Sequence, residues 1–213
     1  MHRILQAAVI SILCYTGSIA YGQAYVDLLK AAREGDAKTV QRLLDRGLDP
    51  DTADSNGNTI LMLAAQLGHK DLARLLVSRR ASINKRSPHG DTALMMASLR
   101  GDMEITRMLV DNGAELNHAA GWSPLHYAAF ENRAEIVRYL IGKGAERDAL
   151  APNGYSALML AARGGHVEAA RALLYDDVDL KVKGPKGETA LSIAQDRKHS
   201  DLVELLKRAG AVE

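Results

Sequence analysis

The stretch Gly57-Asn58-Thr59-Ile60-Leu61 decides the fold, because its order of glycine, hydroxyl residue and leucine recurs at a near-constant interval. Each of the five glycines precedes Thr or Ser by two positions and Leu by four, and they are separated by 33, 31, 33 and 33 residues. These glycines are Gly57, Gly90, Gly121, Gly154 and Gly187. Such a period predicts a stack of small supersecondary units, which offers long surfaces to partners and rarely contains a reaction site.

The repeat around this stretch reads as a turn, a helix, a break, a second helix and an extended tail. Gly57 can adopt the positive φ of a tight turn, and Thr59 can cap the next helix by accepting a hydrogen bond from a first-turn N–H. Residues 60–67 and 70–79 form the two predicted helices, with a Gly-His pair between them. Helices this short are unstable alone in water, so each repeat must be stabilised by burial against its neighbours.

A second series of glycines marks the end of the second helix, where a left-handed residue is commonly needed. Arg80 and Asp177 stand at the equivalent positions of the two repeats that lack this glycine. A left-handed conformation costs a non-glycine residue on the order of 1 kcal/mol, so we expect both positions to be local weak points. The glycines of this series are Gly47, Gly113, Gly144 and Gly210.

The chain resembles the ankyrin repeat family over residues 24–211, on the motif Ser123-Pro124-Leu125-His126-Tyr127-Ala128-Ala129 and its less exact copies at residues 59–65 and 156–162. The resemblance implies an all-α fold, an ankyrin-repeat solenoid of six stacked helix-turn-helix units with short β-hairpin-like turns. Only the fourth repeat has the motif histidine, His126, so we expect the hydrogen bonds of that histidine to be missing from the other repeats. The residues that replace it are Met62, Met95, Met159 and Ser192.

The predicted organisation is an export signal peptide at residues 1–22 followed by an ankyrin repeat domain at residues 23–213. The first repeat lacks the turn, Thr and Leu opening, as expected of an N-terminal cap. The last repeat has charged outer positions that suit a C-terminal cap. The expected repeats are 24–54, 55–87, 88–118, 119–151, 152–184 and 185–213.

The N-terminus has the features of an export signal: a basic start, an apolar run at residues 4–20 and a small-x-small pattern at residues 20–22. An uncleaved membrane anchor is the alternative, since a run of about 17 residues is at the lower limit for crossing roughly 30 Å of hydrocarbon. Cys14 is the only cysteine, and Leu13 before it argues against lipidation. A mature chain without cysteine favours a bacterial periplasm, and secretion is a further alternative.

Composition and motifs argue against nucleic-acid, catalytic and metal-binding functions. The net charge is +1, and removing residues 1–22 leaves 26 basic and 26 acidic residues, a balance that does not suit a polyanionic ligand. The histidines belong to different repeats and have no short metal-ligand spacing. The sequence has no phosphate-binding loop and no nucleophile elbow. We therefore expect no enzyme activity, no cofactor, no metal, no nucleic-acid partner and, after signal cleavage, no membrane contact.

Members of the family usually bind partners through the turn tips and the exposed ends of the first helices, and this maps a candidate surface onto the chain. Trp122 and Phe130, the only Trp and the only Phe, fall within it, and interface hot spots favour Trp, Tyr and Arg. The alternative for Trp122 is local packing, because the loop before Gly121 is two residues shorter than its counterparts. The predicted partner-binding residues are Asn58, Leu67, Asp91, Leu99, Arg100, Trp122, Phe130, Glu131, Tyr155 and Arg163.

The sequence therefore predicts a non-catalytic protein–protein interaction scaffold in the cell envelope, which binds an unidentified protein through its turn tips and concave face. We expect a monomer, because the resemblance implies a finite stack with polar ends. Two alternatives stay open: a secreted effector that acts on a host protein, and an enzyme or small-molecule carrier. The second of these needs a pocket with convergent polar groups.

Overall fold

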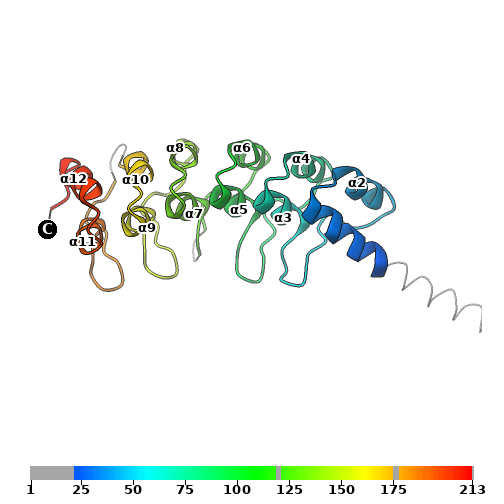
Figure 1. Cartoon of the computed structure of the whole chain (residues 1–213), viewed down its shortest axis with the longest axis horizontal. Helices are drawn as coiled ribbons and strands as arrows, with labels where there is room; N and C mark the ends of the chain where they lie inside the picture. Colours follow the sequence, from blue (N-terminus) through cyan, green and yellow to red (C-terminus); the bar gives the residue numbers. More distant parts are fainter. Residues whose placement is uncertain (1–21, 119–120, 175–177, 213) are drawn as a thin grey trace, which may run out of the picture.

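The chain forms an elongated stack of helix pairs in the computed structural model, which describes residues 22–118, 121–174 and 178–212 (Figure 1). Two rows of helices run along the stack, and the loops that join successive repeats project from the side of the first row. The predicted all-α solenoid is thereby confirmed. Within the described residues β-structure is limited to two isolated bridges, which pair Ala53 with Thr59 and Leu150 with Ser156.

Each repeat contributes one helix to each row. The first row consists of residues 22–34, α3 (Ile60–Leu67), α5 (Ala93–Arg100), α7 (Pro124–Phe130), α9 (Ala157–Gly164) and α11 (Ala190–Asp196). The second row consists of α2 (Ala37–Asp45), α4 (Lys70–Ser78), α6 (Met103–Asp111), α8 (Ala134–Gly142), α10 (Val167–Leu173) and α12 (Ser200–Arg208).

The core lies between the two rows and consists of two clusters of buried residues, one in the first three repeats and one in the last three, with the half-buried Val110 and Leu116 packed against both. Paired alanines such as Ala64 and Ala65 of α3, or Ala128 and Ala129 of α7, are fully buried. Their small side chains allow α3, α5, α7, α9 and α11 to contact one another in sequence. The second row adds a column of buried aliphatic side chains, each of which stabilises the fold by about 2 kcal/mol relative to exposure. This column includes Leu72, Ile105, Ile136 and Leu202.

Hydroxyl side chains cap the first helices, as the sequence pattern predicts. The five caps accept from the N–H three residues later at 3.2–3.4 Å. They are Thr59, Thr92, Ser123, Ser156 and Thr189. Each cap satisfies one of the N–H groups that a helix start leaves unpaired.

The expectation that the motif's hydrogen bonds are missing outside the fourth repeat is wrong for two repeats. The Thr59 N–H donates to Met62 Sδ at 3.4 Å, and the Thr189 N–H donates to Ser192 Oγ at 2.9 Å. Both bonds reproduce the one from the Ser123 N–H to His126 Nδ1. Sulfur is a weak acceptor, but its position at the third helical residue suffices to close the capping box.

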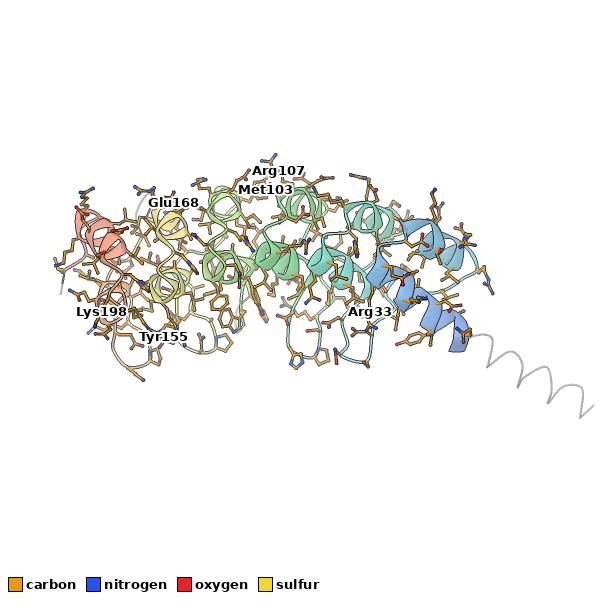
Figure 2. The ribbon with its side chains drawn as sticks, viewed as in Figure 1. Arg33, Met103, Arg107, Tyr155, Glu168 and Lys198 are labelled. Carbon is orange, nitrogen blue, oxygen red and sulfur yellow. The ribbon has the colours of Figure 1, made fainter. Side chains whose placement is uncertain are left out.

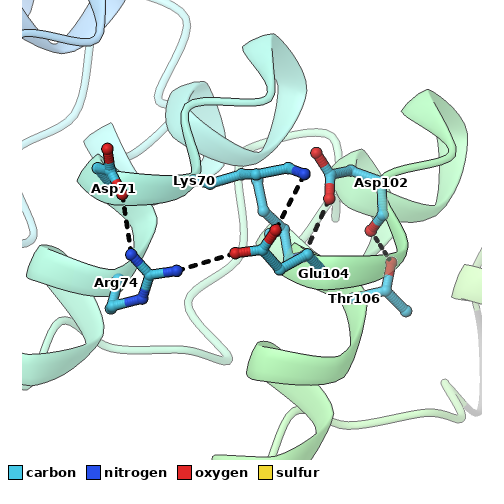
Figure 3. Close-up of polar contacts among 7 residues, drawn as sticks. Lys70, Asp71, Arg74, Asp102, Glu104 and Thr106 are labelled. Carbon is cyan, nitrogen blue, oxygen red and sulfur yellow. Dashed lines mark hydrogen bonds and ion pairs between the residues drawn. The ribbon is translucent and has the colours of Figure 1, made fainter.

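Ion pairs connect neighbouring helices of the second row. The Glu104 carboxylate at the start of α6 contacts Lys70 Nζ at 2.9 Å and Arg74 Nη2 at 2.8 Å, and Arg74 also pairs with Asp71 (Figure 3). The bond to Glu104 raises the pKa of Lys70. All four side chains are well exposed to solvent, so the network contributes less to stability than the buried columns.

Left-handed residues end the helices, and one of the two predicted weak points lies among the described residues. Arg80 has a φ of 60°, as predicted from its alignment with glycines, whereas Asp177 lies outside the described residues. Asn132 and Lys198 also have positive φ, at 55° and 61°, after the first helices of the fourth and sixth repeats. The sequence analysis did not identify these two positions.

Replacing Arg80 by Gly should raise the melting temperature by about 2–4 °C, because glycine adopts positive φ without the cost of about 1 kcal/mol that a Cβ imposes. Arg80 is exposed, and its substitution leaves the core intact. Thermal unfolding followed by circular dichroism measures the change.

Gly113→Arg is the matched control, since Gly113 holds the same position one repeat later, has a φ of +86° and has open space around its Cβ direction. This variant should melt at a lower temperature than the parent chain. An Arg80→Gly variant that melts no higher than the parent would contradict the strain assigned to this residue.

Candidate partner-binding surface

One side of the stack, called here the recognition face, is formed by the loop tips before the first helices and by the C-terminal ends of those helices. Tyr155 and Lys198 lie on this side, whereas Arg107 and Glu168 lie on the opposite side, along the second row of helices (Figure 2). The ten residues predicted from the sequence divide into a loop-tip row and a helix-end row. The loop-tip row holds Asn58, Asp91, Trp122 and Tyr155, and the helix-end row holds Leu67, Leu99, Arg100, Phe130, Glu131 and Arg163.

Asn58 takes part in the closure of its own hairpin. Its backbone N–H donates to Asp54 Oδ1 at 3.0 Å, and its carbonyl accepts from the Asp54 N–H at 2.9 Å. Asp54 is buried and pairs with Arg33, near the end of the first helix of the first repeat, at 3.2 Å. The backbone of Asn58 is therefore fixed, and its half-buried side chain is displayed from a rigid tip.

Trp122 lies over the start of α7 and is only partly exposed. Its ring centroid is 5.4 Å from that of Tyr127 and 5.9 Å from that of His126, the latter in an edge-to-face arrangement. The Tyr127 hydroxyl donates to Asp91 Oδ1 of the preceding repeat at 2.6 Å. Trp122 therefore makes the contacts expected of a local packing role. It also keeps part of its surface exposed, as a role in partner binding requires.

Tyr155 connects the fifth and sixth loop tips. Its hydroxyl donates to Glu188 Oε1 at 2.8 Å, which raises the pKa of Tyr155. The guanidinium of Arg163 lies 5.9 Å from the centroid of the same ring, within the range of a cation–π contact. These contacts orient the aromatic ring and the guanidinium before any partner arrives.

The helix-end row is apolar in the middle of the stack. Leu67 is 38% exposed and Phe130 is 45% exposed, and Leu99 between them is half-buried. Nearly half of the Phe130 side chain is in water, where its apolar surface is unfavourable. These side chains are therefore the part of the recognition face that gains most from being covered by another molecule.

Side chains from each following repeat hold the carbonyl ends of the first helices. The donors are an imidazole Nε2 or a guanidinium N–H, and the acceptors are carbonyl oxygens of the preceding repeat. The bonds run from His69 to Arg33, Arg100 to Gln66, Arg133 to Leu99 and His166 to Phe130, at 2.9, 3.2, 3.2 and 2.8 Å. Arg100 therefore has a structural contact in addition to its predicted place in the binding surface.

Phe130, Glu131 and Arg163 line one open hollow together with Arg197. Asn58 and Leu67 belong to the second repeat and extend the rows without reaching this hollow. The structure thus brings three of the ten predicted residues together at one site and places the other seven elsewhere along the recognition face.

Tyr127 is absent from the predicted set, whereas Arg197 falls among the exposed helix ends onto which the family resemblance maps the surface. Tyr127 occupies the fifth position before the left-handed residue that ends the first helix. When the second to sixth repeats are aligned, this position is aliphatic in every repeat except the fourth, where Tyr127 brings a hydroxyl group. The residues at this position in the other four repeats are Leu63, Met96, Leu160 and Ile193.

The motif histidine is neutral and holds two loop tips together. Since Nδ1 of His126 accepts from the Ser123 N–H at 3.1 Å, the ring hydrogen lies on Nε2, which donates to the Ala149 carbonyl at 3.0 Å. The ring is buried, and burial lowers the pKa of His126 below its ordinary value of 6.5. Protonation would also turn Nδ1 into a donor that faces another N–H.

Within residues 22–118, 121–174 and 178–212, no helix has the length and apolar character needed to cross a membrane. The same part of the chain contains no cluster of His, Cys, Asp or Glu side chains arranged to hold a metal ion.

The family model described as ankyrin repeats (3 copies) matches residues 28–120, 80–151 and 125–212. An ankyrin repeat-containing protein of Treponema pallidum (strain Nichols) is 41% identical over 97 residues, which cover 45% of this chain and 33% of that protein.

More distant similarity reaches animal proteins. Ankyrin repeat and KH domain-containing protein 1 of Homo sapiens is 38% identical over 89 residues, 41% of this chain and 4% of that protein. An L-asparaginase of Dirofilaria immitis is 35% identical over 97 residues, 46% of this chain and 16% of that protein. In each case the matched segment spans at most about a third of the relative, so the similarity concerns the repeats and not the whole proteins.

Replacing His126 by Met should reduce the dependence of stability on pH between about pH 7.5 and 5.5. Because the pKa of His126 is lowered in the folded state, the unfolded chain binds its proton first as the pH falls, and the parent chain loses stability on acidification. Methionine fills the equivalent buried position in three other repeats and carries no titrating proton.

The measurement is the free energy of unfolding in urea at several pH values for the parent chain and the His126→Met variant. The variant should be less stable by about 1 kcal/mol at pH 7.5, where the bond to Ala149 is lost. The difference between the two chains should shrink at pH 5.5. A constant difference across this range would contradict the neutral assignment of His126.

Proposed function

The chain belongs to the ankyrin repeat family, and we propose that it is a non-catalytic scaffold of the cell envelope that binds one protein partner through its recognition face. Ankyrin repeats are generally protein–protein interaction modules. The observation that carries the proposal is the row of exposed apolar side chains, Leu67, Leu99 and Phe130, on a face whose backbone is fixed by bonds between repeats. A surface that is already ordered loses little conformational entropy on association.

The assignment to the cell envelope rests on the sequence of the first 22 residues, and so does cleavage before Gln23. A monomeric state fits the stack, since the N-terminal end is lined by charged residues that include Asp27, Glu34 and Arg42. Polar ends disfavour the stacking of one copy on another.

Truncating the two most exposed apolar residues of the helix-end row, in a Leu67→Ala, Phe130→Ala variant, should weaken partner binding about tenfold. The expected change in melting temperature is smaller than that of a core truncation, because Leu67 and Phe130 are already 38% and 45% exposed. Trp122 and Tyr155 are left intact, since their contacts with Tyr127 and Glu188 would mix binding with stability. The assay is quantitative capture from a cell-envelope extract on immobilised residues 23–213.

Val26→Ala is the matched control: Val26 is 55% exposed and lies outside the predicted set. This variant should capture the same protein as the parent chain at the same yield. Equal capture by the Leu67→Ala, Phe130→Ala variant would exclude the helix-end row as the binding surface.

Expression of the full chain in a bacterium with an export pathway should yield a periplasmic protein whose intact mass begins at Gln23. The small-x-small pattern at residues 20–22 places the cleavage there. Replacing Ala20 by Trp should block cleavage, because it removes the first small residue of the small-x-small pattern. The uncleaved chain should then stay bound to the membrane fraction. A cytoplasmic protein that retains Met1 would contradict both the export and the cleavage.

A further inference from the structure

A glycine opens a notch in the helix-end row of the fifth repeat. In every repeat the first helix is followed by a residue with positive φ, and the residue before it ends the helix-end row. The fifth repeat has Gly164 at this place, and the other five repeats have a larger side chain. Those five are Glu34, Leu67, Arg100, Glu131 and Arg197.

Gly164 lies close to its neighbour His166, and its own backbone conformation does not call for a glycine. A Cβ on Gly164 would lie 2.3 Å from His166 Nε2, the atom that donates to the Phe130 carbonyl at 2.8 Å. Leu67 holds the same place beside His69, whose Nε2 makes the same bond to the Arg33 carbonyl, so the absence of a side chain is particular to the fifth repeat. An open hollow lies at this place, and its lining comprises Phe130, Glu131, Leu160, Arg163, Gly164, His166 and Arg197.

The hollow combines an apolar wall with two cations. Phe130 is 45% exposed at its rim, and Leu160 is buried beneath it. Arg163 and Arg197 are both exposed, and Arg163 is oriented by the ring of Tyr155. Among the described residues neither arginine has a carboxylate within 4.0 Å, unlike Arg133, which pairs with Glu131.

Glu131 belongs to the lining of the hollow, and two further acidic groups, Glu188 and Asp196, come from the sixth repeat. Glu131 has Arg133 at 3.9 Å, and Glu188 accepts from the Tyr155 hydroxyl and from the Lys186 N–H. Asp196 is exposed but makes no ion pair with a described residue. The histidine of the site is committed through Nε2 to a carbonyl. The lining of the hollow therefore contains two guanidinium groups and one carboxylate, that of Glu131, so it has a net positive charge.

We propose that this hollow, the Gly164 notch, receives an acidic side chain of the partner, with a neighbouring apolar side chain of the partner covering Phe130. Guanidinium groups bind carboxylates through paired N–H donors, and the aliphatic stem of a glutamate matches the apolar wall. The inference rests on the proposed protein-binding function and adds the chemistry of the bound segment: a stretch of chain that alternates acidic and apolar residues.

Fluorescence anisotropy with synthetic peptides tests the notch directly. The probe is a fluorescein-labelled twelve-residue peptide made of Gly-Leu-Glu units, and the controls replace Glu by Gln or by Lys. The acidic probe should bind residues 23–213 saturably and more weakly as salt rises from about 50 to 300 mM. The Gln and Lys probes should bind at least fivefold more weakly.

Charge reversal locates the binding. Arg163→Glu, Arg197→Glu should weaken the acidic probe about tenfold, and Arg163→Lys, Arg197→Lys should retain part of the affinity because it keeps the charge. Arg138→Glu, an exposed change on α8, should leave the affinity unchanged. Melting temperatures of all variants confirm that each one is folded.

Amide shifts in the ¹⁵N spectrum provide a second readout, in which the acidic probe should move the Gly164 resonance. The inference is overturned if the three probes bind alike, if the reversed pair binds the acidic probe as well as the parent does, or if no saturable binding occurs at millimolar probe. Partner capture that depends on Phe130 but not on Arg163 and Arg197 would reject the notch while leaving the proposed function in place.

Discussion

The structure depends on one constraint: no helix pair of this chain can exist without its neighbours. The helices from α2 to α12 have seven to nine residues, a length at which an isolated helix is unstable in water. Each pair buries its apolar side chains mainly against the pairs before and after it, through columns such as the alanines of α3, α5 and α7. Stability is therefore a property of the interfaces between repeats, and a residue matters according to the interface that it fills.

The polar contacts follow the same logic. The amide of Asn84 donates to the Gly113 carbonyl at 2.9 Å and accepts from the Glu115 N–H at 2.9 Å, and Asn117 repeats this arrangement with Gly144 and Glu146. Backbone groups that no strand pairs are satisfied in this way by the side chain of the preceding repeat. The loop tips are consequently as well positioned as the helices, which is what a rigid binding face requires.

The features set by this constraint could be predicted from the sequence, and the features set by individual side-chain conformations could not. Periodicity placed the caps, the helices and the left-handed Arg80, because each is imposed by a position that recurs in every repeat. Asn132 and Lys198 stand in register with the glycines that end the other first helices, Gly35, Gly68, Gly101 and Gly165, so the argument that predicts Arg80 from the second-helix glycines could have predicted them as well. The bond to Met62 Sδ was missed because it depends on a rotamer and not on a residue type that usually accepts hydrogen bonds.

The recognition face differs from the core in what selects its residues. A core position must fit two neighbouring repeats, whereas the loop tips and helix ends are less constrained, although side chains such as Arg100 and Tyr155 still contact a neighbouring repeat. Phe130 and Leu67 leave more than a third of their apolar side chains in water, which another molecule could cover. Gly164 lies where the two regimes meet, because it neighbours His166, which bonds to the preceding repeat, and because its missing side chain leaves room on the surface beside two arginines. One short segment thus carries both a contact that stabilises the stack and the opening at which we expect the stack to meet its partner.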